Sequence, residues 1–162
     1  MPIPEFIVEL RTKIGHDFIL LPGTVGVVQN AAGEVLCLRR SDTGAWSLPS
    51  GIVEPGEQPA QTMTREIYEE TNLRARVTRI LAVITEDIVH YTNGDQVQYV
   101  TMVFACDALT TDLHANDGEA LELKFFPPDN LPKIRLLTET VDLATLLREP
   151  TTFIWEESWL EP

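Results

Sequence analysis

Three glutamates lie close together in one short stretch of this sequence and are well placed to do chemistry. Glu66, Glu69 and Glu70 are spaced i, i+3 and i+4, so on a helix turning about 100° per residue they project from one side. The apolar residues of the same stretch form an adjoining stripe: Ala60, Met63 and Ile67. Carboxylates that edge a buried face repel one another and lose hydration unless a cation lies among them. The spacing therefore favours a divalent metal site.

The alternative for an acid-rich helix is a solvated face with no site, and the flanking residues argue against it. Five residues separate Gly51 from Glu57, and seven more lead to Arg65-Glu66. Ile67 and one further residue then precede Glu69-Glu70. Residue usages are roughly 5 to 10% each, so these identities at fixed spacing do not coincide by chance in one chain of this length.

This pattern resembles the box of the Nudix hydrolase family: Gly, five residues, Glu, seven residues, Arg-Glu, an aliphatic residue, any residue, Glu-Glu, any residue, Gly and an aliphatic residue. The close resemblance covers residues 51–73. A looser one extends over residues 23–132 through Leu38-Arg39-Arg40, Trp46-Ser47-Leu48-Pro49, Lys124-Phe125-Phe126 and Leu131-Pro132. The chain departs from the family's pattern at two positions. The usual Gly-Gly at the start of the box is Ser50-Gly51 here, and the late glycine of the box is Asn72. Both changes are conservative. In the family, the residue at the position of Ser50 lends only its backbone carbonyl to the metal, and asparagine tolerates the left-handed conformation.

The resemblance implies a MutT-like pyrophosphohydrolase with an α/β fold. This is a Nudix-type α/β/α sandwich with a mixed central sheet and a loop-helix-loop catalytic motif. It implies Mg²⁺-dependent hydrolysis of a nucleoside diphosphate linked to a group X. The substrate class is then a nucleoside triphosphate, ADP-ribose, a nucleotide sugar or a dinucleoside polyphosphate.

Metal ligands follow from the resemblance together with the donor types. It implies Glu69, Glu70 and the Ser50 carbonyl as ligands, and Glu66 as a further ligand or as the general base that takes a proton from a metal-bound water. Oxygen-only ligation suits Mg²⁺, or Mn²⁺, rather than zinc.

Two further roles are implied by the same resemblance. Glu57 and Arg65 are expected to pair across the loop-helix junction through a bidentate bond that holds the ligand geometry; the alternative for Arg65 is a plain surface arginine. Another acid is expected from the loop or strand start after the long hairpin, as ligand or base. Glu119 is the first candidate and Glu122 the second, and either is otherwise a surface glutamate.

Candidate substrate-binding residues have weaker sequence signals than the box residues. Arg39 and Arg40 end a strand that leads into the box loop, where they reach phosphates or are simply solvated. Trp46 is a candidate for stacking a base, with a core or loop anchor as the alternative. Tyr91 lies eighteen residues past Leu73, where a tyrosine in some family members is associated with dinucleoside polyphosphates.

The elements that position these residues can be read from periodicity and turn signals. A helical cap over 4–14 precedes a strand hairpin with strands at 24–28 and 34–39, and a loop over 41–57 leads to a helix over about 59–71. Long strands over 73–91 and 96–109 flank Asn93-Gly94, the second with apolar residues on both faces. A strand over 120–126, a helix over 136–147 and a tail over 151–162 complete the chain. The tail carries Trp155 and Trp159, which are expected to pack on the body or on a second copy in a homodimer.

Composition sets the broad class. The 162 residues suit one domain, residues 1–162, and 12 Lys and Arg against 25 Asp and Glu give a net charge of −13. Such an acidic chain repels a nucleic-acid polymer, so a small nucleotide is the expected partner. No apolar run is long enough for a membrane span. Cys37 and Cys106 lack metal or disulfide spacing and are expected to be buried thiols, consistent with a cytoplasmic setting.

Two other functions compete with hydrolysis. A Nudix-fold nucleotide-binding sensor or regulatory module without turnover would suit a degenerate box, whereas here every charged box residue is present. An ordinary acidic domain without a site requires the box match to be accidental.

Overall fold

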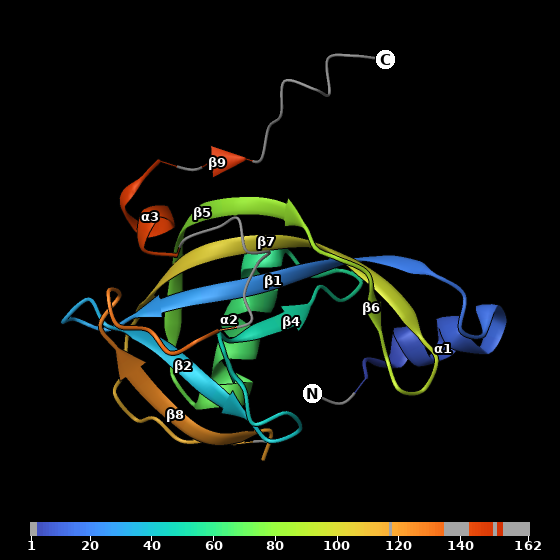
Figure 1. The fold of residues 1–162 in the computed structure, drawn as a ribbon, viewed down its shortest axis with the longest axis horizontal. Helices are drawn as coiled ribbons and strands as arrows, with labels where there is room; N and C mark the ends of the chain where they lie inside the picture. Colours follow the sequence, from blue (N-terminus) through green and yellow to red (C-terminus); the bar gives the residue numbers. More distant parts are fainter. Residues whose placement is uncertain (1–2, 117, 135–142, 151, 154–162) are drawn as a thin grey trace.

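The computed structural model describes residues 3–116, 118–134, 143–150 and 152–153. Its elements, in chain order (Figure 1), are α1 Glu5–Ile14, β1 Ile19–Gln29, β2 Val35–Arg40, β3 Trp46–Ser47, β4 Ser50–Ile52, α2 Pro59–Thr71, β5 Ala75–Thr85, β6 Val89–His90, β7 Gln96–Ala108, β8 Ala120–Phe126, α3 Leu143–Arg148 and β9 Thr152–Phe153. The expected helix over 59–71 and strand over 120–126 coincide with α2 and β8.

The strands form a mixed sheet in the order β3-β2-β1-β7-β5-β9, with β4 also paired to β1, β6 to β7 and β8 to β2. β1 and β7 run parallel along the whole of β1, from Ile19 opposite Val97 to Gln29 opposite Asp107. β5 pairs antiparallel with β7 as expected, but the strand expected over 73–91 is interrupted: β5 ends at Thr85, and the short β6 pairs with β7 beside the Asn93-Gly94 turn. The mixed α/β architecture predicted from the sequence is therefore confirmed.

The expected hairpin of the first two strands is present only at its turn. β1 and β2 are in register at a single pair, Gln29 and Val35. The side chain of Asn30 organises this turn, because its Oδ1 accepts the N–H groups of Ala32 and Glu34 at 2.9 and 3.0 Å. β2 then diverges to pair with β8, which leaves the edge of β1 to β4. This exchange of partners brings the box loop onto the sheet.

Both faces of the sheet are covered, because successive strand residues point to opposite sides. α2 covers one face, and the buried residues of that layer are Val28, Leu36, Met63, Ile67, Leu73, Phe104 and Cys106. α3 packs on the other face, and the buried cluster there includes Val27, Val35, Cys37, Leu81, Val103, Leu143 and Leu146. Ala60, expected on the apolar stripe of α2, is exposed. The buried face is centred nearer to Met63, Glu66 and Glu70, which leaves Ala60 at its edge.

α1 forms a cap at the end of the molecule toward which the start of β1, the β6 strand and the start of β7 extend (Figure 1). Pro4 precedes the helix, and Gly15 ends it with a positive φ of 60°. Ile7 is buried against Leu21 and Val97, with Phe6, Ile19, Ile52 and Tyr99 packed around them. The helical cap predicted over 4–14 is thus present and closes one end of the sheet.

Near the C-terminus, only the last part of the helix expected over 136–147 can be compared, since 135–142 fall outside the described residues. That part is α3, which ends before Pro150. Trp155 and Trp159, expected to pack on the body or on a second copy, also fall outside them. Across the described ranges, every helix is too short or too polar to cross a membrane. Cys37 and Cys106 are buried free thiols, and burial raises the pKa of each to about 12.

Candidate active site

The helix α2 carries most of the box, and its ends follow from local sequence. Pro59 occupies the first helical position, where a missing N–H is harmless. Asn72 ends the helix in the left-handed conformation with φ 62°, and its N–H donates to the Tyr68 carbonyl at 2.8 Å. Its side-chain amide donates to the Asp112 carboxylate at 3.0 Å. Asparagine therefore fills the place of the box glycine with the geometry expected for a left-handed cap.

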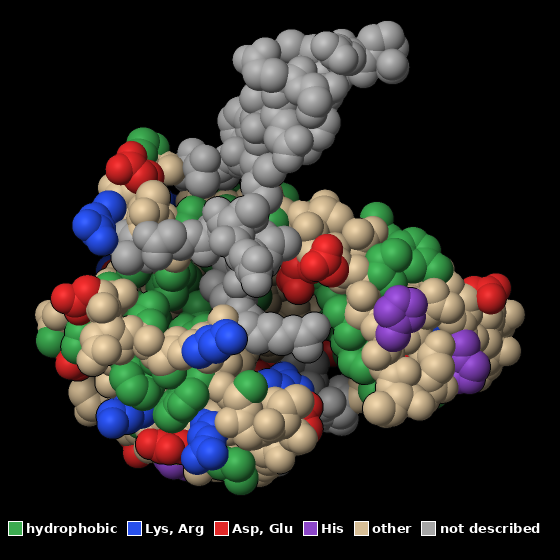
Figure 2. Space-filling model, in the orientation of Figure 1, with side chains coloured by type: hydrophobic (Ala, Val, Ile, Leu, Met, Phe, Trp, Pro, Cys, Tyr) green, Lys and Arg blue, Asp and Glu red, His purple; other side chains and the backbone are tan. Residues whose placement is uncertain are grey.

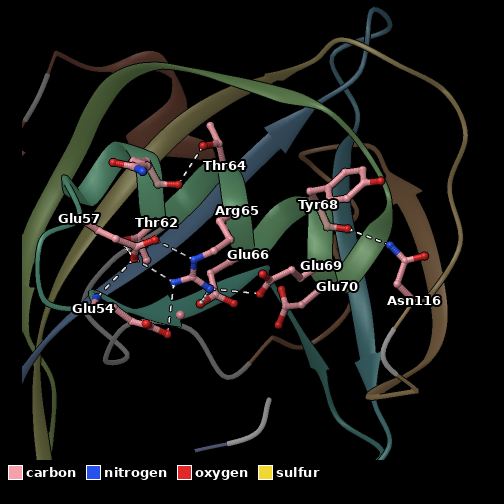
Figure 3. Close-up of polar contacts among 12 residues, drawn as sticks. Glu54, Glu57, Thr62, Thr64, Arg65, Glu66, Tyr68, Glu69, Glu70 and Asn116 are labelled. Atoms are coloured by element: carbon pink, nitrogen blue, oxygen red, sulfur yellow. Dashed lines mark hydrogen bonds and ion pairs between the residues drawn. The ribbon is translucent and has the colours of Figure 1, made fainter. Parts of the chain in front are cut away.

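Arg65 lies at the centre of the acidic cluster (Figure 3). Its Nε and Nη2 donate to the two carboxylate oxygens of Glu57 at 2.8 and 3.0 Å, which is the bidentate pair expected from the sequence. Its Nη1 donates to Glu66 at 2.8 Å and to Glu69 at 3.1 Å. The cation that these crowded carboxylates require is thus supplied in part by the chain's own arginine.

Two of the three glutamates held by this arginine, Glu57 and Glu66, have opposite electrostatic environments. Hydrogen bonds from Arg65 and Thr62 lower the pKa of Glu57 to about 2, with Arg65 the main cause. Burial raises the pKa of Glu66 to about 7, although Arg65 acts in the opposite direction. Glu66 is only 1% exposed, so loss of hydration outweighs the ion pair.

Glu66 also accounts for the glycine that opens the box. A Cβ at position 51 would overlap the carboxyl group of Glu66, which packs against the bare Cα of Gly51. Gly51 lies opposite Thr24 in the β1–β4 pair, and it contacts α2 through the Glu66 side chain. The box glycine is therefore required by packing.

Glu70 is joined to the strand that precedes the loop. It is 6% exposed, and its Oε2 accepts the N–H of Ser50 at 3.2 Å. Ser50 in turn lies opposite Val25 in the β1–β4 pair. The side chain of Glu69, by contrast, is 51% exposed and faces Arg65. In the described parts of the chain, no three Asp, Glu, His or Cys side chains are close enough to form a preassembled metal site.

A cavity of about 360 Å³ lies beside these residues, on one face of β1 and β7. Its floor consists of alternate residues of the two strands: Ile19, Leu21, Gly23 and Val25 from β1, and Val97, Tyr99 and Thr101 from β7. Ser50 and Glu70 line one end, while Pro4, Ile7 and Arg11 of the α1 region line the other. Figure 2 shows a hollow between the α1 end and the body of the molecule, with acidic side chains at its edge.

The end of the cavity that Ser50 and Glu70 line is called the box end. Glu119 lies there together with Glu70 and Arg40. Its carbonyl accepts the N–H of Ser41 at 2.7 Å, which ties the start of β8 to the end of β2. Glu122, the second candidate for this additional acid, is exposed in β8 opposite Arg39 and is not among the residues that line the cavity. The strand pairing therefore brings Glu119, and not Glu122, to Glu70.

The expected substrate-binding residues divide into two groups. Arg40 and Tyr91 line the cavity. Arg39 points to the opposite side of β2 from Arg40, where its Nε donates to the Gly44 carbonyl at 3.1 Å. Trp46 packs edge-to-face on Phe126, with ring centroids 5.1 Å apart, so its ring is engaged in the core as an anchor. Neither Arg39 nor Trp46 lines the cavity.

Other cavity residues were not predicted from the sequence. Glu86 follows β5, Thr101 and Tyr99 lie in β7, and Arg11 lies in α1. Arg11 pairs through its Nε with Asp95 at 3.1 Å, which joins α1 to the turn before β7. Their only sequence signal is a polar residue at the end or on one face of an apolar strand or helix, which is too common to single them out.

The NUDIX domain family model matches residues 20–148. A MutT-like protein of Streptomyces ambofaciens is 31% identical over 106 residues, which are 65% of this chain and 63% of that protein. The RNA pyrophosphohydrolase of Yersinia enterocolitica is 46% identical over 56 residues, 35% of this chain and 32% of that protein. The chain thus spans less than two thirds of the length of these relatives.

Among solved structures, a UDP-X diphosphatase superposes with a TM-score of 0.67 at 25% identity. The superposition covers 93% of this chain and 74% of the other. It therefore covers more of the chain than the residues matched by the family model.

Proposed function

Because the chain belongs to the NUDIX domain family, we propose that it hydrolyses the pyrophosphate bond of a small nucleotide, a nucleoside diphosphate linked to a second group. The observation that supports this proposal is the meeting of Glu70 and Glu119 with Arg40 at one end of a single cavity. The two carboxylates come from α2 and the start of β8, so two separate elements present acids to the same space. Arg40 lies beside them with its Nε and Nη2 paired to the Asp42 carboxylate at 2.9 and 2.6 Å, and the other N–H groups of its guanidinium suit a phosphate.

The donor types of the box suit a divalent cation, and of these donors Ser50, Glu70 and Glu119 line this end of the cavity. Glu66, Glu69 and Glu70 on α2, together with Glu119 and the Ser50 carbonyl, would hold it through oxygen atoms alone. That donor set suits Mg²⁺ or Mn²⁺ rather than zinc. When bound, the cation neutralises phosphate charge and makes a bound water more acidic.

The chain's own residues have distinct roles in this proposal. Glu57 holds Arg65 by two hydrogen bonds, and Arg65 in turn positions Glu66 and Glu69, which would contact a bound cation. Arg40 orients the phosphates, and either Glu66 or Glu119 takes the proton of the attacking water. The oxygen of that water bonds to phosphorus as the bridging P–O bond breaks, and the bridging electron pair leaves with the departing phosphate.

The test is release of phosphate or of a nucleoside monophosphate from a panel of substrates, with Mg²⁺ and with EDTA. The panel comprises dNTPs, ADP-ribose, UDP-glucose, a dinucleoside polyphosphate and a short RNA with a 5′-triphosphate. The RNA is included because one relative is named an RNA pyrophosphohydrolase, whereas the net charge of −13 argues against a polymer.

Matched variants make this test specific. Glu70→Gln and Glu119→Gln are expected to lower turnover by orders of magnitude. The control Glu122→Gln changes an exposed residue of β8 and should leave turnover unchanged. Full activity in EDTA or in Glu70→Gln would overturn the proposal. If nothing is hydrolysed while one compound raises the melting temperature, the protein is instead a nucleotide-binding module.

A further inference from the structure

The cavity floor has successive levels along β1, and strand register sets their order. Val25 lies opposite Ser50 at the box end. Two residues back, Gly23 lies opposite Thr101, and two further back Leu21 lies opposite Tyr99. Because a strand rises about 3.3 Å per residue, each level is roughly 7 Å from the next. If the phosphates of a ligand lie at the box end, the part of the ligand about 7 Å away lies beside Thr101, and the part about 14 Å away lies beside Tyr99.

Glu86 stands at the middle level. Its backbone N–H donates to the Tyr99 carbonyl at 2.9 Å, and its carbonyl accepts the side-chain amide of Gln98 at 2.9 Å. These bonds fix the backbone directly after β5. The Thr101 hydroxyl donates to the Glu86 carboxylate. Both side chains line the cavity, so Glu86 contributes an acid that lies outside the box.

The outer level is apolar and aromatic apart from the ion-paired Arg11 and Asp95, which also line the cavity. Leu21 and Ile7 are buried there beside Tyr99. The hydroxyl groups of Tyr91 and Tyr99 are hydrogen-bonded at 2.9 Å. α1 closes this end and is held to the β7 side by the ion pair of Arg11 with Asp95. Apolar and aromatic walls of this kind suit a flat nucleobase.

We propose that Glu86 binds the sugar hydroxyls of a ribonucleotide, with the base beyond it against Tyr99 and α1. This inference rests on the proposed function in one respect, because it takes the phosphates to lie at the box end. An ionised carboxylate only accepts hydrogen bonds, and with one donor already supplied by Thr101 it has capacity for more. It repels phosphate, whereas a vicinal diol offers two O–H donors. In a nucleotide these hydroxyls lie between the phosphates and the base, as Glu86 lies between the two ends of the cavity.

The kinetic test compares each ribonucleotide that is turned over with its 2′-deoxy and 3′-deoxy counterparts. The wild-type protein is expected to favour the ribonucleotide by about tenfold or more in kcat/KM. Glu86→Gln, whose amide oxygen still accepts from Thr101, should lose several-fold of this preference, and Glu86→Ala most of it. The matched control is Asp87→Asn, an exposed neighbour that does not line the cavity and should keep the full preference.

A binding test separates this inference from hydrolysis. Melting temperatures are measured in EDTA with ribonucleoside and deoxyribonucleoside diphosphates of all four bases. The ribonucleotide should raise the melting temperature more than its deoxy form in the wild type, and this difference should vanish in Glu86→Ala. If it does so while nothing is hydrolysed, the inference stands and the proposed hydrolysis fails.

Three outcomes would overturn the sugar assignment. One is equal effects of ribonucleotides and deoxyribonucleotides on the wild type. Another is a change of base preference, rather than of sugar preference, in the Glu86 variants. The last is that no nucleoside diphosphate binds or is turned over, which would also remove the basis of the proposed function.

Discussion

The carboxyl group of Glu66 occupies the space above Gly51 that any side chain at position 51 would need. Glu66 is buried in this contact and also accepts a hydrogen bond from Arg65 at 2.8 Å. Through these two interactions the central acid of α2 is wedged between β4 and the Arg65 guanidinium. The geometry of the acidic cluster therefore depends on a glycine fifteen residues earlier in the chain.

Gly51→Ala is expected to destabilise the protein by about 1–3 kcal/mol, the usual cost of forcing an extra carbon into a packed site. Denaturant unfolding in EDTA measures this cost. In a Glu66→Ala background the same substitution should cost less, because the overlapping carboxyl group is gone. An equal cost in both backgrounds would show that the overlap with Glu66 is not the cause.

The stability of the metal-free protein should depend on the protonation of Glu66. Its pKa is about 7 in the fold against an ordinary value of 4.5, so the unfolded chain loses this proton more readily. The fold is therefore expected to lose stability as the pH rises from about 4.5 to about 7. Melting temperatures in EDTA should show this decline in the wild type and in the exposed-residue control Glu122→Gln. The decline should be weaker in Glu66→Gln, and the same slope in all three proteins would contradict the assignment.

Glu57 should act in the opposite sense at acid pH. Its pKa is lowered to about 2 by Arg65, so the pair stabilises the fold above about pH 4.5, and this stabilisation is lost as the pH falls toward 2. Glu57→Gln should therefore melt lower than the wild type at pH 7, with a gap that narrows as the solution is acidified. Glu54→Gln is the matched control from the same loop, since its contact with Arg65 is a distant 4.0 Å. A gap that is constant with pH would exclude the ion pair as its source.

Asn72 tests the conservative departure from the box. Asn72→Ala is expected to cost about 1–2 kcal/mol, because alanine resists the left-handed conformation. Asn72→Gly keeps that conformation and loses only the bonds to Asp112, so it should cost less. Urea denaturation of the two variants measures the difference. If the glycine variant is as unstable as the alanine variant, the stability at this position comes from the bonds to Asp112 and not from the backbone conformation.

The sequence by itself identified the parts of this protein whose geometry is local. The helix over 59–71 follows from a proline at its start, periodic apolar residues and an asparagine at its end. The pairing of Glu57 with Arg65 was implied by the resemblance to the Nudix box, since Glu57 lies in the loop before the helix. The helix itself is set by the 3.6-residue period over a few turns, so nearby residue types suffice to predict it.

Tertiary structure alone decided which distant segments meet. The period-two pattern of a strand shows which side chains share a face, but it does not name the neighbouring strand. β4 rather than most of β2 pairs with β1, which seats the box loop beside the sheet. β8 pairs with β2, so Glu119 reaches the cavity and Glu122 does not. Glu86 and α1 complete the cavity for the same reason, because their positions depend on long-range strand register that no local pattern encodes.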